Sequence, residues 1–205
     1  GRSADRVLCL FPMEPAIYAR HGVDARFVGH PLARRFAMEP DQVAARAHLG
    51  LPADVPILAV LPGSRLGEIA RLGGDFIATA RRLRDAIPNL VVLAPMANAA
   101  CRRAFETMLN ASDHQSIRVV DGDAHRTMIA ADAVLLASGT AALEALLAKR
   151  PMVVAYRLSN LTYRIVKSLG LMKVDHYSLP NFLSKSPIVP ELMQDDCRPE
   201  ALEAA

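Results

Sequence analysis

The stretch AVLLASGTAALEAL, Ala133 to Leu146, decides the fold. Its first five residues form an apolar run of the kind found in fully buried parallel strands. The small residues Ser138–Thr140 follow, and Ala141–Leu147 is rich in strong helix formers. A strand, a small-residue turn and a helix in this order point free backbone N–H groups at a ligand. Because the helix dipole is positive at that end, the pattern predicts a bound anion.

The side chains of this stretch suggest that the anion is a phosphate attached to a sugar. Gly139 has no Cβ and would let a phosphate approach the backbone closely. Ser138 and Thr140 can cap the helix and can also offer hydroxyls to phosphate oxygens. Glu144 lies one turn beyond Thr140, where a carboxylate can accept hydrogen bonds from two sugar hydroxyls. The simpler alternative is that both hydroxyl residues are ordinary caps and that Glu144 is a surface residue.

Short apolar runs alternate with helical patterns on both sides of this stretch. Strands are expected at Pro56–Leu61, Leu90–Ala94, Ile117–Val120, Ala133–Ala137 and Pro151–Tyr156. Helices are expected at about Glu68–Ile87, Asn98–Leu109, Ala124–Ala130 and Asn160–Leu169. This alternation predicts a Rossmann-like, doubly wound parallel α/β sheet.

The turns that follow these strands are expected to meet. Right-handed crossovers place all of them at one edge of the sheet, which is the edge where open α/β sheets bind ligands. The turns are Gly63–Glu68, Pro95–Asn98, Asp121–His125, Ser138–Thr140 and Tyr156–Asn160.

The N-terminal part of the chain is expected to belong to another lobe. A strand at Val7–Phe11, a helix at Ala16–His21 and a strand at Arg26–Gly29 precede a proline-containing segment, Gly29–Pro40. We interpret that segment as a linker between two lobes. Residues 1–30 would then end the first lobe and begin the linker, and residues 31–205 would form the second lobe.

The turn LPGSR, Leu61–Arg65, is the second candidate for anion binding. It has the spacing of neither a P-loop nor a dinucleotide fingerprint. Gly63 and Ser64 nevertheless place Arg65 at a strand end, where its guanidinium suits bidentate phosphate contacts. Glu68 could hold Arg65 in place or simply favour the start of the helix. The alternative for Arg65 is a surface side chain that closes a loop.

Two later segments have possible binding roles. The segment Tyr156–Lys173 contains Arg157, Arg164 and Lys167 among apolar residues, and it has no acidic residue. It is either a basic amphipathic surface for an anionic membrane or a helix that covers the sheet. In Tyr177–Asn181 the proline fixes the backbone and the amide of Asn181 can grip a sugar or a uracil, although the segment also fits a plain turn. A helix is expected at Pro187–Gln194.

Composition excludes several classes of function. Apolar residues make up 52% of the chain and charged residues 22%, which fits a soluble globular protein. A net charge of +3 and sparse aromatic residues give no reason to expect a nucleic-acid surface. The three cysteines lie far apart, which predicts a reducing compartment, and the sequence has no metal-ligand spacing. No apolar run approaches the roughly 18 residues of a membrane span.

Six blocks of sequence, in this order, resemble the lipid-A-disaccharide synthase family. They are FPMEPAIY at 11–18, FVGHPL at 27–32, LPGSR at 61–65 with Glu68, LASGTAALE at 136–144, PMVVAYR at 151–157, and SLPN at 178–181 with PEL at 190–192. The resemblance implies the nucleotide-sugar-binding lobe of a two-lobed GT-B glycosyltransferase. The first lobe and the terminal helices of the family are not matched.

The resemblance also implies an activity and its partners. The family transfers 2,3-diacylglucosamine from UDP-2,3-diacylglucosamine to 2,3-diacylglucosamine 1-phosphate, with inversion and without metal or cofactor. It works at the inner face of the bacterial inner membrane, so the implied location is cytoplasmic and peripheral on an anionic membrane surface. A lone second lobe is expected to bind UDP without catalysing the reaction.

Site residues follow from the same resemblance. Gly63, Ser64, Arg65, Ser138, Gly139, Thr140 and Glu144 fall on the family's UDP-binding positions. Arg65 and Asn181 are expected to be catalytic, with the general base in the absent lobe. Lipid contacts are predicted for Arg157, Arg164 and Lys167. The alternatives are a UDP-N-acetylglucosamine 2-epimerase-like enzyme and a non-catalytic membrane-surface module.

Overall fold

The computed structural model describes residues 4–159, 162–164, 168 and 176–205, and the chain divides into two compact units. The first unit is Gly1–Pro40 and the second is Asp41–Ala205. The division falls at the end of the segment that we predict as a linker. The assignment of the first unit to another lobe remains a prediction.

The first unit is one parallel β–α–β crossover. Strand β1 (Arg6–Cys9) pairs in parallel with β2 (Asp24–Phe27), and helix α1 (Glu14–Ala19) connects them. A 3-10 helix, η1 (Pro31–Arg34), follows. Two strands and one short helix cannot cover all their apolar side chains. The side chains left more than half exposed include Leu8, Ile17, Phe27 and Val28.

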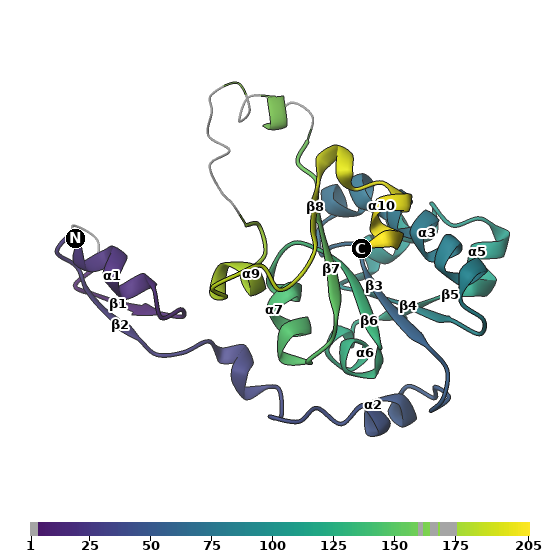
Figure 1. Cartoon of the computed structure of the whole chain (residues 1–205), viewed down its shortest axis with the longest axis horizontal. Coiled ribbons are helices and arrows are strands. Elements are labelled where there is room, and N and C mark those ends of the chain that lie inside the picture. Colours follow the sequence, from purple (N-terminus) through teal and green to yellow (C-terminus); the bar gives the residue numbers. More distant parts are fainter. Residues whose placement is uncertain (1–3, 160–161, 165–167, 169–175) are drawn as a thin grey trace. The chain divides into compact units, whose positions relative to one another are not determined.

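The second unit is built on a parallel sheet whose order, among the described residues, is β5-β4-β3-β6-β7-β8 (Figure 1). The strands are β3 (Ile57–Leu61), β4 (Val91–Met96), β5 (Ile117–Asp121), β6 (Ala133–Ala137), β7 (Met152–Tyr156) and β8 (Glu191–Met193). Every pairing between them is parallel. The predicted doubly wound α/β sheet is therefore confirmed.

Helices cover both faces of this sheet (Figure 1). One layer holds α3 (Leu66–Ala86), which contacts α4 (Ala99–Glu106) and α10 (Pro199–Ala204). The other layer holds α6 (Ala124–Ala130), which contacts α2 (Gln42–His48) and α7 (Thr140–Leu147). All five residues of β3 are buried between the layers, as expected for an apolar central strand. The described residues of this unit also form α5 (Ala111–Ser116), α9 (Leu179–Leu183) and a 3-10 helix, η2 (Gln194–Asp196).

The predictions for the C-terminal part of the chain were less accurate. The helix expected at Pro187–Gln194 is wrong, because Glu191–Met193 pair with β7 as the edge strand β8. The expected turn at Tyr177–Asn181 instead leads into α9, whose first turn accommodates Pro180. Most of the helix expected at Asn160–Leu169 lies outside the described residues.

A buried ion pair fixes α5 against α3. Asp113 has a side chain that is 1% exposed, and Arg81 of α3 donates to both of its carboxylate oxygens. The backbone N–H of Asn110 donates to the same carboxylate at 2.8 Å. The contact with Arg81, more than the bond from Asn110, holds the pKa of Asp113 below its ordinary value despite the burial.

Asp113→Asn is expected to destabilise the fold by about 1–3 kcal/mol at neutral pH, because Arg81 loses its charged partner. The folded-state pKa of Asp113 is lowered below the ordinary value of 3.8. The contribution of its carboxylate to the free energy of unfolding is therefore complete above that value and is lost as the pH falls through the folded-state pKa. Urea unfolding between pH 7 and pH 2.5 gives the free energy of unfolding of the parent and of the variant, and the difference between these two values should shrink in acid. Glu106→Gln, in the more exposed pair with Arg102, is the control and should change stability little. A difference that stays constant down to the lowest pH would contradict the assignment.

Candidate functional site

A cavity of about 480 Å³ lies at the carboxyl ends of the central strands. It opens where the strand order switches, since the chain continues from β3 toward β4 on one side and from β6 toward β7 on the other. Open α/β sheets bind ligands at such a switch point. Its lining includes four of the five predicted turns, represented by Gly63, Ser64, Arg65, Glu68, Pro95, Met96, Ala97, Gly122, Asp123, Ala124, Ser138, Gly139 and Thr140.

The start of α7 brings unpaired backbone donors to this cavity. Gly139 precedes the helix, and its carbonyl accepts from the N–H of Ala142. Within the described part of the chain, the N–H groups of Gly139, Thr140 and Ala141 have no hydrogen-bond acceptor, and all three residues line the cavity. These are the orphan donors of a helix N-terminus, which a phosphate satisfies. A Cβ at Gly139 would meet nothing within 4 Å, so the space beside this residue is open.

Ser138 has a different role from the one expected. Its hydroxyl donates to the carbonyl of Tyr177 at 2.7 Å, and its N–H donates to the carbonyl of Ala155 at 2.8 Å. Neither Ser138 nor Thr140 caps α7 through its side chain, so the capping alternative is wrong for both. The hydroxyl hydrogen of Ser138 is already used within the chain. Thr140 lines the cavity with a hydroxyl that has no partner among the described residues.

Glu144 lines the same cavity one turn into α7. Its carboxylate forms no ion pair and no hydrogen bond with any residue that the structure describes. A half-buried carboxylate of this kind can accept hydrogen bonds from a pair of ligand hydroxyls. The position therefore fits the predicted ribose contact.

The turn between β3 and α3 is shaped by Glu68. Its carboxylate accepts from the N–H of Ser64 at 2.8 Å and from that of Arg65 at 3.2 Å, and it pairs with the Arg65 guanidinium at 3.0 Å. Gly63 has φ +129°, and a Cβ there would lie 2.4 Å from the Cβ of Glu68, so this position requires glycine. The backbone N–H groups of Ser64 and Arg65 are thus occupied. The Arg65 side chain is 82% exposed and remains accessible to a ligand.

Two further cavities adjoin the α7 N-terminus, and all three share Ser138. One, of about 350 Å³, lies between Ser138–Thr140 and a wall formed by His176, Tyr177, Ser178, Leu179 and Phe182. The other, of about 470 Å³, is lined by Arg65, Glu68, Arg71, Leu72, Ala137, Tyr156, Arg157, Leu158, Ser159 and Thr162 together with Ser138. The fifth predicted turn, after β7, therefore also reaches the site. The turn at Ser138–Thr140 is the centre of the site.

Asn181 does not have the environment expected of a catalytic residue. It is 2% exposed, and its amide nitrogen donates to the carbonyl of Val189 at 2.9 Å and to Glu191 at 2.8 Å. Its amide oxygen accepts from the N–H groups of Ile188 at 2.7 Å and Val189 at 3.0 Å. All four hydrogen-bonding positions of the amide are occupied by the chain. The structure thus assigns Asn181 to fixing the loop, which argues against the direct catalytic contact that we predicted.

The predicted lipid contacts have unequal support. The Arg157 guanidinium pairs with Asp75 and donates to the carbonyls of Gln194 and Cys197, so it faces the protein and not a membrane. Arg164 is exposed, and Lys167 lies outside the described residues. Over the described ranges, no helix has both the length and the apolar character to span a membrane.

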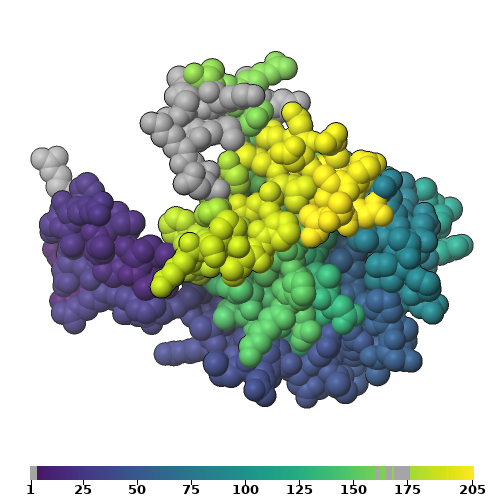
Figure 2. Space-filling view, in the orientation of Figure 1, coloured from purple at the N-terminus to yellow at the C-terminus, as the bar shows by residue number. Residues whose placement is uncertain are grey.

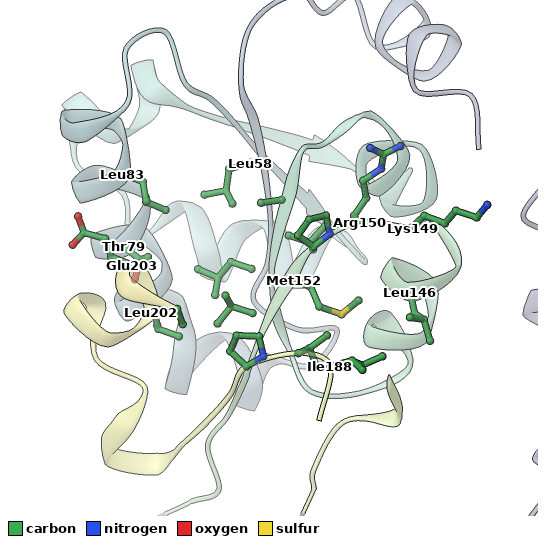
Figure 3. A pocket seen from close by; sticks show the side chains of 18 residues that line it. Leu58, Thr79, Leu83, Leu146, Lys149, Arg150, Met152, Ile188, Leu202 and Glu203 are labelled. Atoms are coloured by element: carbon green, nitrogen blue, oxygen red, sulfur yellow. The ribbon is translucent and has the colours of Figure 1, made fainter. Parts of the chain in front are cut away.

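An apolar cavity of about 450 Å³ lies at the opposite, amino ends of the strands (Figure 3). Its lining includes Ala133 and Met152, which begin β6 and β7, and Leu58, Leu202 and Ile188. Figure 3 shows the Lys149 ammonium directed away from the apolar lining. On the outside, the C-terminal segment that includes α10 forms part of the surface of this unit (Figure 2). This cavity has none of the free amides found at the start of α7.

Comparisons with known proteins agree with this geometry. A family model described as lipid-A-disaccharide synthetase matches residues 1–205. The lipid-A-disaccharide synthase of Xanthomonas euvesicatoria pv. vesicatoria (strain 85-10) is 59% identical over 204 residues, which are 98% of this chain and 46% of that protein. The lipid-A-disaccharide synthase of Xylella fastidiosa (strain M23) is 53% identical over 207 residues, which are 100% of this chain and 54% of that protein.

A solved structure supports the fold. The ADP-heptose lps heptosyltransferase II of E. coli superposes with a TM-score of 0.56 at 16% identity, over 80% of this chain and 49% of that one. This likeness concerns the fold alone. It confirms the expectation of a Rossmann-like α/β fold.

The chain spans about half the length of the curated relatives that it matches. The match to the family model extends over all 205 residues, and the LPGSR, SGT and SLPN segments meet around one site. The chain belongs to the lipid-A-disaccharide synthetase family.

Proposed function

We propose that this chain is the donor-binding half of a glycosyltransferase of lipid A biosynthesis. Its substrate would be UDP-2,3-diacylglucosamine, whose sugar is transferred to 2,3-diacylglucosamine 1-phosphate with release of UDP. The observation that carries the proposal is the set of three free N–H groups at the start of α7, between Arg65 and Glu144 in one cavity. The family to which the chain belongs supplies the identity of the two sugars.

The geometry suggests how the site would favour departure of UDP. The diphosphate accepts from the N–H groups of Gly139, Thr140 and Ala141 and from the guanidinium of Arg65. Negative charge on the leaving diphosphate grows as the glycosidic bond breaks, so these contacts strengthen in the transition state. Each charge-assisted hydrogen bond supplies about 1.5–3 kcal/mol. Glu144 accepts from the ribose hydroxyls and fixes the nucleoside.

The acceptor hydroxyl must lose a proton during transfer. Glu144 is assigned to the ribose, Glu68 is occupied by Ser64 and Arg65, and Asp123 accepts from the Arg126 guanidinium. We therefore assign the general base to the half of the relatives that this chain does not match. This chain alone is expected to bind UDP and to form no disaccharide.

The location that we propose is the cytoplasmic side of the inner membrane, with peripheral attachment. Both sugar substrates carry acyl chains and therefore reside in a bilayer. Arg164, which is exposed, is the described residue that could face anionic lipid.

Titration calorimetry with UDP tests the assignment of the site. The parent chain should bind UDP, and Arg65→Ala should weaken binding about 10- to 100-fold because one charge-assisted phosphate contact is lost. The same substitution should leave the weaker binding of uridine, followed by NMR, almost unchanged. Glu144→Ala should weaken both ligands by about tenfold, because both carry the ribose.

The matched controls for these variants are Arg103→Ala and Glu106→Gln, both on α4 and outside the lining of the cavity. They should bind UDP as the parent does. No binding of UDP by the parent chain, or equal binding by all five proteins, would contradict the proposed donor site.

Gly139→Ala tests the anion-binding turn separately. The backbone of Gly139 is extended and the new methyl group meets open space, so stability should be unchanged or higher by a few tenths of a kcal/mol. The methyl group would occupy the position of the phosphate, and UDP affinity should fall at least about tenfold.

The control is Gly74→Ala, another position where a Cβ meets nothing within 4 Å, on the exposed face of α3. It should leave UDP affinity unchanged in calorimetry, and thermal melting should show both variants folded. Parent-like UDP affinity in the folded Gly139→Ala variant would exclude the start of α7 as the phosphate site.

A further inference from the structure

We infer that Glu191 positions the wall of the site that faces the sugar, and so determines how well the chain distinguishes a UDP-sugar from UDP. The inference rests on the proposed function, because it concerns the group attached to the diphosphate. Glu191 itself lies on β8 and does not line any of the three cavities around Ser138. It is therefore a positioning residue and not a catalytic one.

The Glu191 carboxylate holds the segment His176–Phe182, which we call the anchored segment, by hydrogen bonds. One oxygen accepts from the N–H of Tyr177 at 2.7 Å. The other accepts from the N–H of Ser178 at 3.0 Å, from the Ser178 hydroxyl, and from the amide of Asn181 at 2.8 Å. The anchor is itself fixed, because Glu191 pairs with Val154 in the sheet. One carboxylate thus ties three residues of the segment to the edge of the sheet.

The anchored segment forms one side of the smallest of the three cavities. His176, Tyr177, Ser178, Leu179 and Phe182 face Ser138–Thr140 across it. The carbonyl of Tyr177 also accepts the Ser138 hydroxyl at 2.7 Å, and the Tyr177 ring stacks on that of Tyr156 with centroids 6.2 Å apart. The position of this wall relative to the start of α7 therefore depends on the contacts of Glu191.

The order of the cavities indicates what this wall would contact. Glu144 lines the larger cavity and not the one bounded by Tyr177. Gly139 and Thr140 line both that cavity and the one bounded by Tyr177. A ligand whose ribose is at Glu144 and whose diphosphate is at the amides would continue into the second cavity. The group that it places there is the sugar, with its acyl chains near the half-exposed Phe182.

The test compares the affinities of two ligands for the same variants. In Glu191→Gln an NH₂ group replaces one acceptor oxygen, and it must face an N–H or NH₂ donor that the carboxylate had satisfied. We expect affinity for UDP-2,3-diacylglucosamine in detergent micelles to fall about tenfold. Affinity for UDP should change by less than about twofold, because, among the described residues, the free amides, Arg65 and Glu144 form no hydrogen bond with the anchored segment.

Glu191→Asp keeps the carboxylate and should recover part of the lost affinity for the UDP-sugar. Glu203→Gln is the control, because it removes a carboxylate that pairs with Arg82 on α3, away from the site. Thermal melting of each variant reports whether the fold is retained. Ser178→Ala, which removes one donor to Glu191, should give a smaller loss in the same direction and remains informative if Glu191→Gln does not fold.

The outcomes separate this inference from the proposed function. A selective loss for the UDP-sugar with partial recovery in Glu191→Asp supports the inference. Equal losses for both ligands, or no loss for either, would overturn it while leaving UDP binding by the parent, and hence the donor site, intact. A parent chain that binds neither ligand would overturn both.

Discussion

The adjacency of β3 and β6 is the constraint on which the rest of the structure depends. From these two central strands the chain is wound outward in opposite directions, to β4 and β5 on one side and to β7 and β8 on the other. The loops that leave β3 and β6 therefore separate and open a cavity between them. The first loop brings Arg65 to this cavity, and the second brings the free N–H groups at the start of α7.

Two carboxylates then determine which donors stay free for a ligand. Glu68 satisfies the N–H groups of Ser64 and Arg65, and Glu191 satisfies those of Tyr177 and Ser178. Tyr177 is half-buried and Ser178 is buried, so their N–H groups need an acceptor, whereas Ser64 and Arg65 are exposed and Glu68 orders their turn. The start of α7 receives no such carboxylate among the described residues. Its donors are therefore available to an external anion, and this is the basis for proposing a diphosphate at a site that has acidic residues nearby.

The sequence predicts the central part of the fold well because the signals there are local. The apolar runs and small-residue turns of Ile57–Leu61 and Ala133–Thr140 specify strand, turn and helix within a few residues. The roles of Ser138 and Asn181 were not predictable in this way. The partner of the Ser138 hydroxyl is 39 positions away, and Asn181 is held by Glu191 on a three-residue strand that we predicted as helix. Edge strands of that length carry almost no periodic pattern, so their contacts emerge only in the folded chain.

In the proposed function, binding of the nucleotide and removal of the acceptor's proton are assigned to different groups. The residues that line the cavity of about 480 Å³ run from Leu61 to Glu144, so all of them belong to the second unit. Its free donors are held by the geometry of a helix start that belongs to that unit. The carboxylates that line this cavity differ in their surroundings, because Glu68 accepts from N–H groups, Asp123 accepts from the Arg126 guanidinium, and Glu144 has no partner among the described residues. Since the proposed function gives Glu144 to the ribose, we assign removal of the acceptor's proton to groups outside this cavity.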